Sequence, residues 1–215
     1  MNFLNNKSFC HFVETTHSTN LLLHELIAQH QDSGTGLPDF FCVSTDYQTA
    51  AKAQGSKTWL SSRGENILAT FYFQPPIAPQ QQSYFNYFFA LTVRKTLSLY
   101  INNVKIKKPN DIYADDKKIA GILIEHHIQG EKLIYSIAGV GININQTQFD
   151  VTLPNPVSLK QITGKTFDRA EILEKIVEIG AFYYKKLQTG AFLELEAEYE
   201  AHIYKSTHNM LNVSF

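Results

Sequence analysis

The sequence lacks long apolar runs and has almost no net charge. Nineteen basic and 20 acidic residues give a formal net charge of −1 at pH 7. This balance supplies no broad field for gathering nucleic acid, so we expect no DNA partner. Without a run of about 18 apolar residues we expect no membrane partner either. No basic segment followed by an apolar run opens the chain, which predicts a cytoplasmic protein without a secretory signal.

Cysteine is also scarce. Cys10 and Cys42 are the two cysteines of the chain, too few for a disulfide framework and without the spacing of a metal site. We therefore expect reduced, buried thiols and no metal ligands from the protein. The chain has 215 residues, 44% of them hydrophobic, enough for a single well-buried domain over 1–215.

Hydrophobic periodicity predicts alternating strands and helices. Strands are expected at 41–45, 67–73, 104–107, 112–114, 118–127 and 131–139, and helices at 19–31, 81–100, 190–203 and after Asp168. Strands dominate the middle and helices flank them, which favours an α+β fold with a mixed sheet and helices on one face. His126 and His127 are neighbours on one predicted strand, so they point to opposite faces and we give them no catalytic role.

The most informative stretch runs from Lys107-Lys108-Pro109-Asn110-Asp111 to Lys118-Ile119-Ala120-Gly121-Ile122-Leu123. It predicts a corner, a short strand, a tight turn and a second strand. This path brings together the carboxylate of Asp111, the amide of Asn110 and the ammonium of Lys118. Such a trio suits chemistry at an acyl phosphate. A surface hairpin with solvated lysines is the simpler alternative.

This stretch resembles the signature of biotin protein ligases, in which Lys-Trp-Pro-Asn-Asp precedes a lysine and Ala-Gly-Ile-Leu. Four further motifs follow the family in order: Ser18-Thr19-Asn20, the loop 46–59, Gly64-Glu65-Asn66-Ile67-Leu68 and Gly139-Val140-Gly141-Ile142-Asn143. The chain departs from the family at Lys108, where a Trp is usual, and at Ala51-Lys52-Ala53, where Gly-Arg-Gly is usual. The similarity covers residues 10–190, and we expect no N-terminal DNA-binding domain and a C-terminal small barrel that is absent or nearly so.

The resemblance implies a largely antiparallel sheet in a class II aminoacyl-tRNA-synthetase-like catalytic domain. It also implies an ATP-dependent ligase with two steps. Biotin and ATP, with Mg²⁺ on the phosphates, give biotinyl-5'-AMP, and biotin then passes to a lysine of a biotin carboxyl carrier protein. A homodimer is left open.

The same resemblance assigns roles to residues. Lys118, Lys52 and Asp111 are the expected catalytic groups. Those expected to bind substrate are Ser18, Thr19, Asn20, Gln48, Gly121 and Gly141, and those expected at the nucleotide are Trp59, Asn110, Asn143 and Lys57. Ser18 or Thr19 also suits a helix N-cap. Trp59 suits either stacking on adenine or anchoring the core.

Two alternatives stay open. A lipoate or octanoate ligase or transferase of the same superfamily would share the lysine near an Asn-Asp-like corner. A biotin-binding protein with reduced catalysis is the other, because Ala51 and Ala53 disfavour the positive φ angles that glycine allows.

Overall fold

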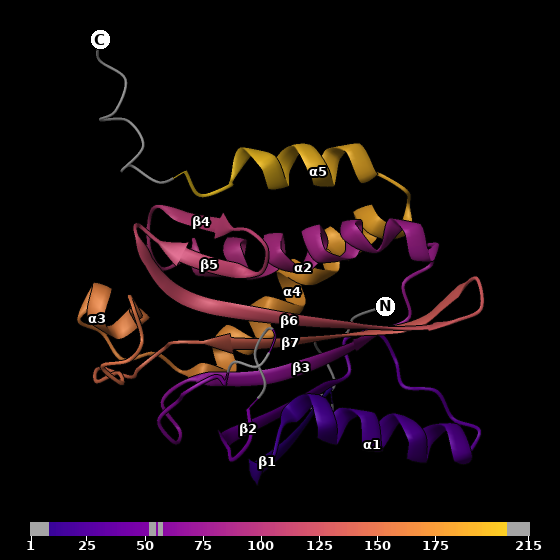
Figure 1. Cartoon of the computed structure of the whole chain (residues 1–215), viewed down its shortest axis with the longest axis horizontal. Coiled ribbons are helices and arrows are strands. Elements are labelled where there is room, and N and C mark those ends of the chain that lie inside the picture. The colour runs from indigo at the N-terminus through magenta and orange to yellow at the C-terminus, as the bar shows by residue number, and fades with distance from the viewer. Residues whose placement is uncertain (1–8, 52–54, 56–57, 206–215) are drawn as a thin grey trace.

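The computed structural model describes residues 9–51, 55 and 58–205. These residues form a seven-stranded sheet in the order β1-β2-β3-β7-β6-β5-β4. The strands are β1 (Cys10–Thr16), β2 (Cys42–Gln48), β3 (Ile67–Phe73), β4 (Val104–Lys107), β5 (Asp111–Ala114), β6 (Lys117–Gln129) and β7 (Lys132–Ile142). β1 and β2 are parallel, and the other neighbours are antiparallel (Figure 1). The predicted mixed, largely antiparallel sheet is confirmed.

Helices cover both faces of the sheet. They are α1 (Thr19–Asp32), α2 (Gln82–Leu97), α3 (Leu159–Thr163), α4 (Arg169–Gln188) and α5 (Phe192–Ala201), with a short 3-10 helix η2 (Pro79–Gln81) before α2. α1 lies on one side of the sheet and α2 and α4 on the other, and α5 packs on α2 (Figure 1). The expectation of helices on one face was therefore wrong.

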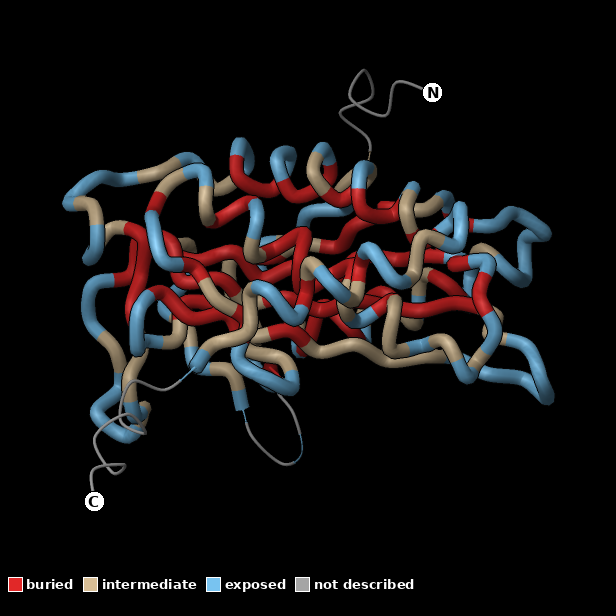
Figure 2. Tube along the Cα trace, turned by 90° about the horizontal axis from the view of Figure 1, so that it is seen from above, coloured by how far each residue is buried: buried red, intermediate tan, exposed pale blue. Residues whose placement is uncertain are grey.

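The central strands explain why helices cover both faces of the sheet. Every residue of β3 is buried. Phe71 belongs to the large core shared with α2 and α4, whereas its neighbour Tyr72 belongs to a smaller core with Leu23 and Ile27 of α1. A strand that is apolar on both sides must be covered on both sides. Figure 2 shows the buried chain running through the middle of the molecule between exposed outer segments.

Most predicted elements are present, and among the strands and α-helices two were missed, β1 and α3. β1 is an edge strand whose residues are all partly or fully exposed, so it lacks the alternation that marks a half-buried strand. α3 is short, and a capping box between Ser158 and Gln161 holds its first turn. The predicted cap of α4 is confirmed, because Asp168 Oδ1 accepts from the Ala170 N–H at 2.7 Å.

The aromatic stripe of α2 is core, as predicted. Phe85, Phe88 and Phe89 are each at most 1% exposed and pack on Phe73. Within the described residues, no helix combines the length and the apolar character needed to cross a bilayer.

Candidate active site

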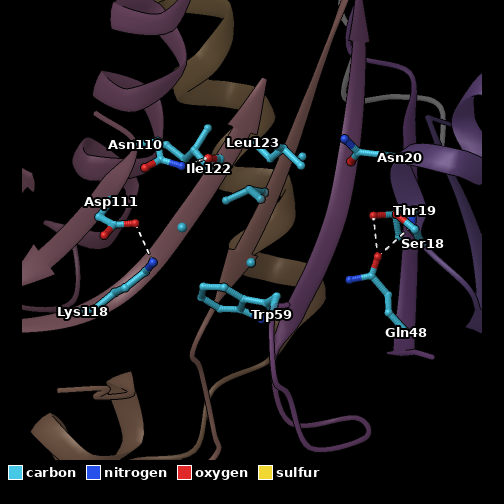
Figure 3. A pocket seen from close by; sticks show the side chains of 14 residues that line it. Ser18, Thr19, Asn20, Gln48, Trp59, Asn110, Asp111, Lys118, Ile122 and Leu123 are labelled. Atoms are coloured by element: carbon cyan, nitrogen blue, oxygen red, sulfur yellow. Dashed lines mark hydrogen bonds and ion pairs between the residues drawn. The ribbon is translucent and has the colours of Figure 1, made fainter. Parts of the chain in front are cut away.

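A polar cavity of about 100 Å³ lies where α1 begins, on the α1 face of β6 and β7. Ten of the expected site residues line it: Ser18, Thr19, Asn20, Gln48, Trp59, Asn110, Asp111, Lys118, Gly121 and Gly141 (Figure 3). They come from segments separated by up to 123 positions in sequence, and the sheet brings them together. Ile122, Leu123, Gly139 and Val140 complete the lining and were not predicted as site residues.

The start of α1 is capped from another strand. Ser18 occupies the N-cap position, but its side chain makes no capping hydrogen bond. Instead, Gln48 at the end of β2 accepts from the Thr19 N–H at 2.8 Å and from the Thr19 hydroxyl at 3.2 Å (Figure 3). Ser18 therefore holds the N-cap position that the sequence predicted, whereas the expected capping by its hydroxyl was wrong. Because Gln48 takes this role, the Ser18 hydroxyl is left to face the cavity.

Asn20 presents an unpaired donor to the cavity. Its Oδ1 accepts from the Thr70 hydroxyl at 2.7 Å, which orients the amide. Its Nδ2 is buried without a hydrogen-bond partner among the described residues. Such a donor costs free energy unless a ligand supplies an acceptor. Thr70 itself was missed; it is the one threonine in the buried run of β3, a signal that the sequence carried.

Lys118 and Asp111 form an ion pair at the opposite wall. The distance between Lys118 Nζ and Asp111 Oδ1 is 2.6 Å, and both side chains are partly exposed to the cavity (Figure 3). The Lys118 backbone is held on both sides, since its N–H donates to the Asn155 carbonyl and its carbonyl accepts from Val157. The predicted hairpin therefore does bring the two charges together, and it holds the ammonium on a fixed strand.

Asn110 braces the same hairpin. Its Nδ2 donates to the Ile122 carbonyl at 2.8 Å, and its own carbonyl accepts from the Ile122 N–H at 2.9 Å. The peptide bond between Lys108 and Pro109 is cis. Lys108, which replaces the family's Trp, points away to an ion pair with Glu200 of α5 at 2.7 Å. Asn110 thus stabilises the hairpin and also lines the cavity.

Trp59 lies flat against two glycines. Gly121 and Gly141 are paired across β6 and β7. A Cβ added at Gly141 would lie 2.4 Å from Trp59 Cε2, and one added at Gly121 would lie 2.8 Å from Trp59 Cζ3. Only glycine leaves room for the indole there. The Trp59 Nε1 is buried without a hydrogen-bond partner among the described residues.

A second cavity of about 310 Å³ adjoins the first and contains Asn143. It has a more apolar wall that includes Leu60, Phe149, Leu153, Pro154 and Pro156. The two cavities share Trp59, Asp111 and Lys118, so the ion pair stands at their junction. Asn143 is anchored there by its Nδ2, which donates to the Val157 carbonyl at 3.1 Å.

Three expectations concern the loop after β2. Lys52, Ala53 and Lys57 lie outside the described residues, whereas Ala51 is buried.

Within the described part of the chain, no group of three or more His, Cys, Asp or Glu side chains is placed to hold a metal ion. Among the described residues, Asp111 is the only carboxylate that lines either cavity of the junction. A resident Mg²⁺ does not fit this donor set.

Comparisons with known proteins agree with the geometry. Residues 12–143 match the model of the "Biotin/lipoate A/B protein ligase family". The chain is 29% identical to the "Bifunctional ligase/repressor BirA" of Bacillus spizizenii, over 86% of this chain and 56% of that protein. It is 25% identical to the "Biotin--[acetyl-CoA-carboxylase] ligase" of Paracoccus denitrificans, over 73% of this chain and 68% of that protein. The chain thus spans a little over half the length of the Bacillus relative.

Solved structures show the same fold. The biotin protein ligase of Aquifex aeolicus in complex with biotin and ATP superposes with a TM-score of 0.74 at 24% identity, over 90% of this chain and 78% of that one. The enzyme of Leishmania major in complex with biotin gives 0.73 at 20% identity, over 98% and 87%. The predicted class II synthetase-like fold is confirmed. Because the family model spans well over half of the sequence, the chain belongs to the biotin/lipoate A/B protein ligase family.

Proposed function

We propose that this protein is a biotin protein ligase. It would join biotin to ATP, giving biotinyl-5'-AMP and pyrophosphate, and then transfer biotin to a lysine of a biotin carboxyl carrier protein in the cytoplasm. The observation that carries the proposal is the junction of two cavities at Lys118 and Asp111. A ligase that activates an acid with a nucleotide needs two adjoining substrate sites with a cation between them.

The polar cavity suits the ureido ring of biotin. That ring has one carbonyl and two N–H groups, all of which need partners once buried. The unpaired Nδ2 of Asn20 is a donor for the carbonyl, and the hydroxyl of Ser18 and the amide of Gln48 supply further polar groups. Gly121 and Gly141 leave room for the indole of Trp59, which forms one wall of this cavity.

The chemistry follows from charge. The carboxylate of biotin and the α-phosphate of ATP repel each other. Lys118 at the junction neutralises both and fixes their approach, while a carboxylate oxygen attacks phosphorus and pyrophosphate leaves. In the second step the lysine amine of the carrier attacks the acyl carbon and AMP departs. Asp111 orients that amine and accepts its proton. Mg²⁺ enters with the phosphates of ATP and belongs to the substrate.

The proposal is tested by pyrophosphate release from ATP in the presence of biotin, lipoate, octanoate or no acid. We expect release with biotin alone, followed by biotin transfer to a carrier domain. Release driven by lipoate or octanoate would assign the protein to the lipoate branch of its family. Biotin binding without any pyrophosphate release would identify a binding protein and overturn the proposal.

A further inference from the structure

The two cysteines lie side by side at one end of the sheet. Cys10 is the first residue of β1 and Cys42 the first of β2, and the parallel register pairs them directly. Neighbouring strands are about 4.7–4.9 Å apart. The Cα atoms of disulfide-bonded cysteines are usually about 4.4–6.8 Å apart. Residues 32 positions apart in sequence therefore meet the basic distance requirement for a bond.

The two thiols are in contact and differ in acidity. Cys42 is the direct register partner of Cys10, and Ser44 Oγ lies 3.1 Å from Cys10 Sγ. The hydrogen bond from Cys42 holds the pKa of the Cys10 thiol below its ordinary value. Burial raises the pKa of Cys42 well above its ordinary value. Cys10 is thus the more readily ionised thiol, and the thiolate is the reactive form.

Cys10 is also the more accessible of the two thiols. Cys42 is fully buried in the large core. Cys10 is partly exposed and lines a cavity of about 280 Å³ between β1, β3 and α4. The walls of this cavity include Phe9, Phe12 and Leu173. A small neutral oxidant can therefore reach Cys10 in the folded chain, whereas Cys42 is reached through Cys10.

We propose that Cys10 and Cys42 are a redox pair that hydrogen peroxide converts to a reversible intrachain disulfide. The Cys10 thiolate attacks one peroxide oxygen, the O–O bond breaks, and the departing hydroxide takes a proton to leave as water. Cys10 is then a sulfenic acid. The sulfur of Cys42 attacks the sulfur of Cys10, and the released hydroxide takes the Cys42 proton as a second water. Two thiols and one peroxide give one disulfide and two waters.

The bond would pin an edge strand. β1 pairs with β2 on one side only within the described sheet. At their far ends the same two strands lead to Thr19 and Gln48, which meet at the polar cavity. A disulfide at the near ends ties β1 to β2 and limits its separation from the sheet. We expect the oxidised protein to have a higher Tm, because the bond constrains the unfolded chain.

Peptide mapping of the whole protein tests the bond directly. The reduced chain is treated with a small excess of hydrogen peroxide, and remaining thiols are blocked with N-ethylmaleimide. Cleavage after Glu14 and Glu25 separates the two cysteines into different peptides. We expect a linked pair lighter by two hydrogens than its parts, which disappears with dithiothreitol, and a Tm rise of several degrees that disappears with it. Cys10 oxidised beyond sulfenic acid while Cys42 stays a thiol would overturn the proposal, as would a bond between two chains.

Two variants separate the roles of the thiols. In Cys42→Ala, Cys10 should stop at the sulfenic acid, which dimedone traps. In Cys10→Ser, Cys42 should remain an unmodified thiol until the chain is unfolded. Equal peroxide reactivity of Cys42 in wild type and Cys10→Ser would show that Cys10 is not the entry point. An oxidised wild type with unchanged Tm would contradict the pinning of β1.

Discussion

Gln48 Oε1 accepts the backbone N–H of Thr19 at 2.8 Å, so a side chain at the end of β2 caps the helix that begins the candidate biotin site. The same Gln48 lines the cavity, and the residue at the N-cap position, Ser18, does not cap. One contact therefore serves both the fold and the site. It couples the position of α1 to that of the neighbouring strand.

Gln48→Ala should cost both stability and biotin affinity. Loss of a helix cap typically costs about 1 kcal/mol, and the helix start would no longer be held at the cavity. The free energy of unfolding in urea and the biotin Kd measure the two effects. Gln31→Ala, at an exposed position of the same helix, is the matched control. Equal results for both variants would show that Gln48 has neither role.

Lys118→Ala should lower the rate of biotinyl-adenylate formation by about 10²-fold or more, because it removes the cation between two anionic substrates. The fold should survive, since the side chain is partly exposed. Biotin-dependent pyrophosphate exchange gives the rate. Lys117→Ala, at the exposed neighbouring residue, should keep normal exchange. Normal exchange in folded Lys118→Ala would remove this lysine from the mechanism.

Asp111→Asn should mainly slow the second step. The amide keeps the size of the side chain but cannot accept the proton of the attacking ammonium, and such general-base contributions are typically about 10²-fold or more. Single-turnover transfer from supplied biotinyl-5'-AMP to a carrier domain measures this step. Asp115→Asn, in the exposed turn, is the control. Normal transfer with slow adenylate formation would instead place Asp111 on the phosphate side.

Gly141→Ala should displace the indole of Trp59, because the new Cβ would lie 2.4 Å from it. Trp59 is the single tryptophan, so its fluorescence reports the change without interference. We expect a red-shifted emission maximum and weakened binding of biotin. Gly36→Ala, where an added Cβ meets no atom within 4 Å, should leave the spectrum unchanged. An unaltered spectrum in Gly141→Ala would contradict the observed packing.

Acid should destabilise the protein through His126. Burial holds the pKa of His126 below its ordinary 6.5. In the unfolded chain His126 therefore binds a proton at a higher pH than in the folded chain. The free energy of unfolding thus falls as the pH drops through 6.5 toward the lower pKa of the folded state. His126→Gln should flatten the dependence of the unfolding free energy on pH between 7.5 and 5.5. His127→Gln, on the exposed side of the strand, should keep the wild-type slope.

The local sequence pattern was sufficient to predict many of the strands and helices of this molecule. The strands from β3 to β7 and the helix α4 follow from residue pattern, helical spacing and an Asp168 cap. From β4 to β7, strands that are consecutive in sequence are also hydrogen-bonded to each other. The closeness of Lys118 to Asp111 followed too, because the hairpin places the two residues on strands β6 and β5, which pair with each other. The opposite directions of His126 and His127 follow from the pleat: one contacts Phe85 and the other stacks on Tyr135.

The ordered motifs Ser18-Thr19-Asn20, Asn110-Asp111, Lys118 and Gly139-Val140-Gly141 predicted residues that line one cavity. Only the tertiary structure decided how they are used. Gln48 rather than Ser18 caps α1, Trp59 rests on Gly141, and Asn143 faces a second cavity. Each depends on segments far apart in the chain that the sheet brings into register. The same reason explains the pairing of Cys10 with Cys42: strand order is a property of the whole core, whereas a residue pattern reports only its own strand.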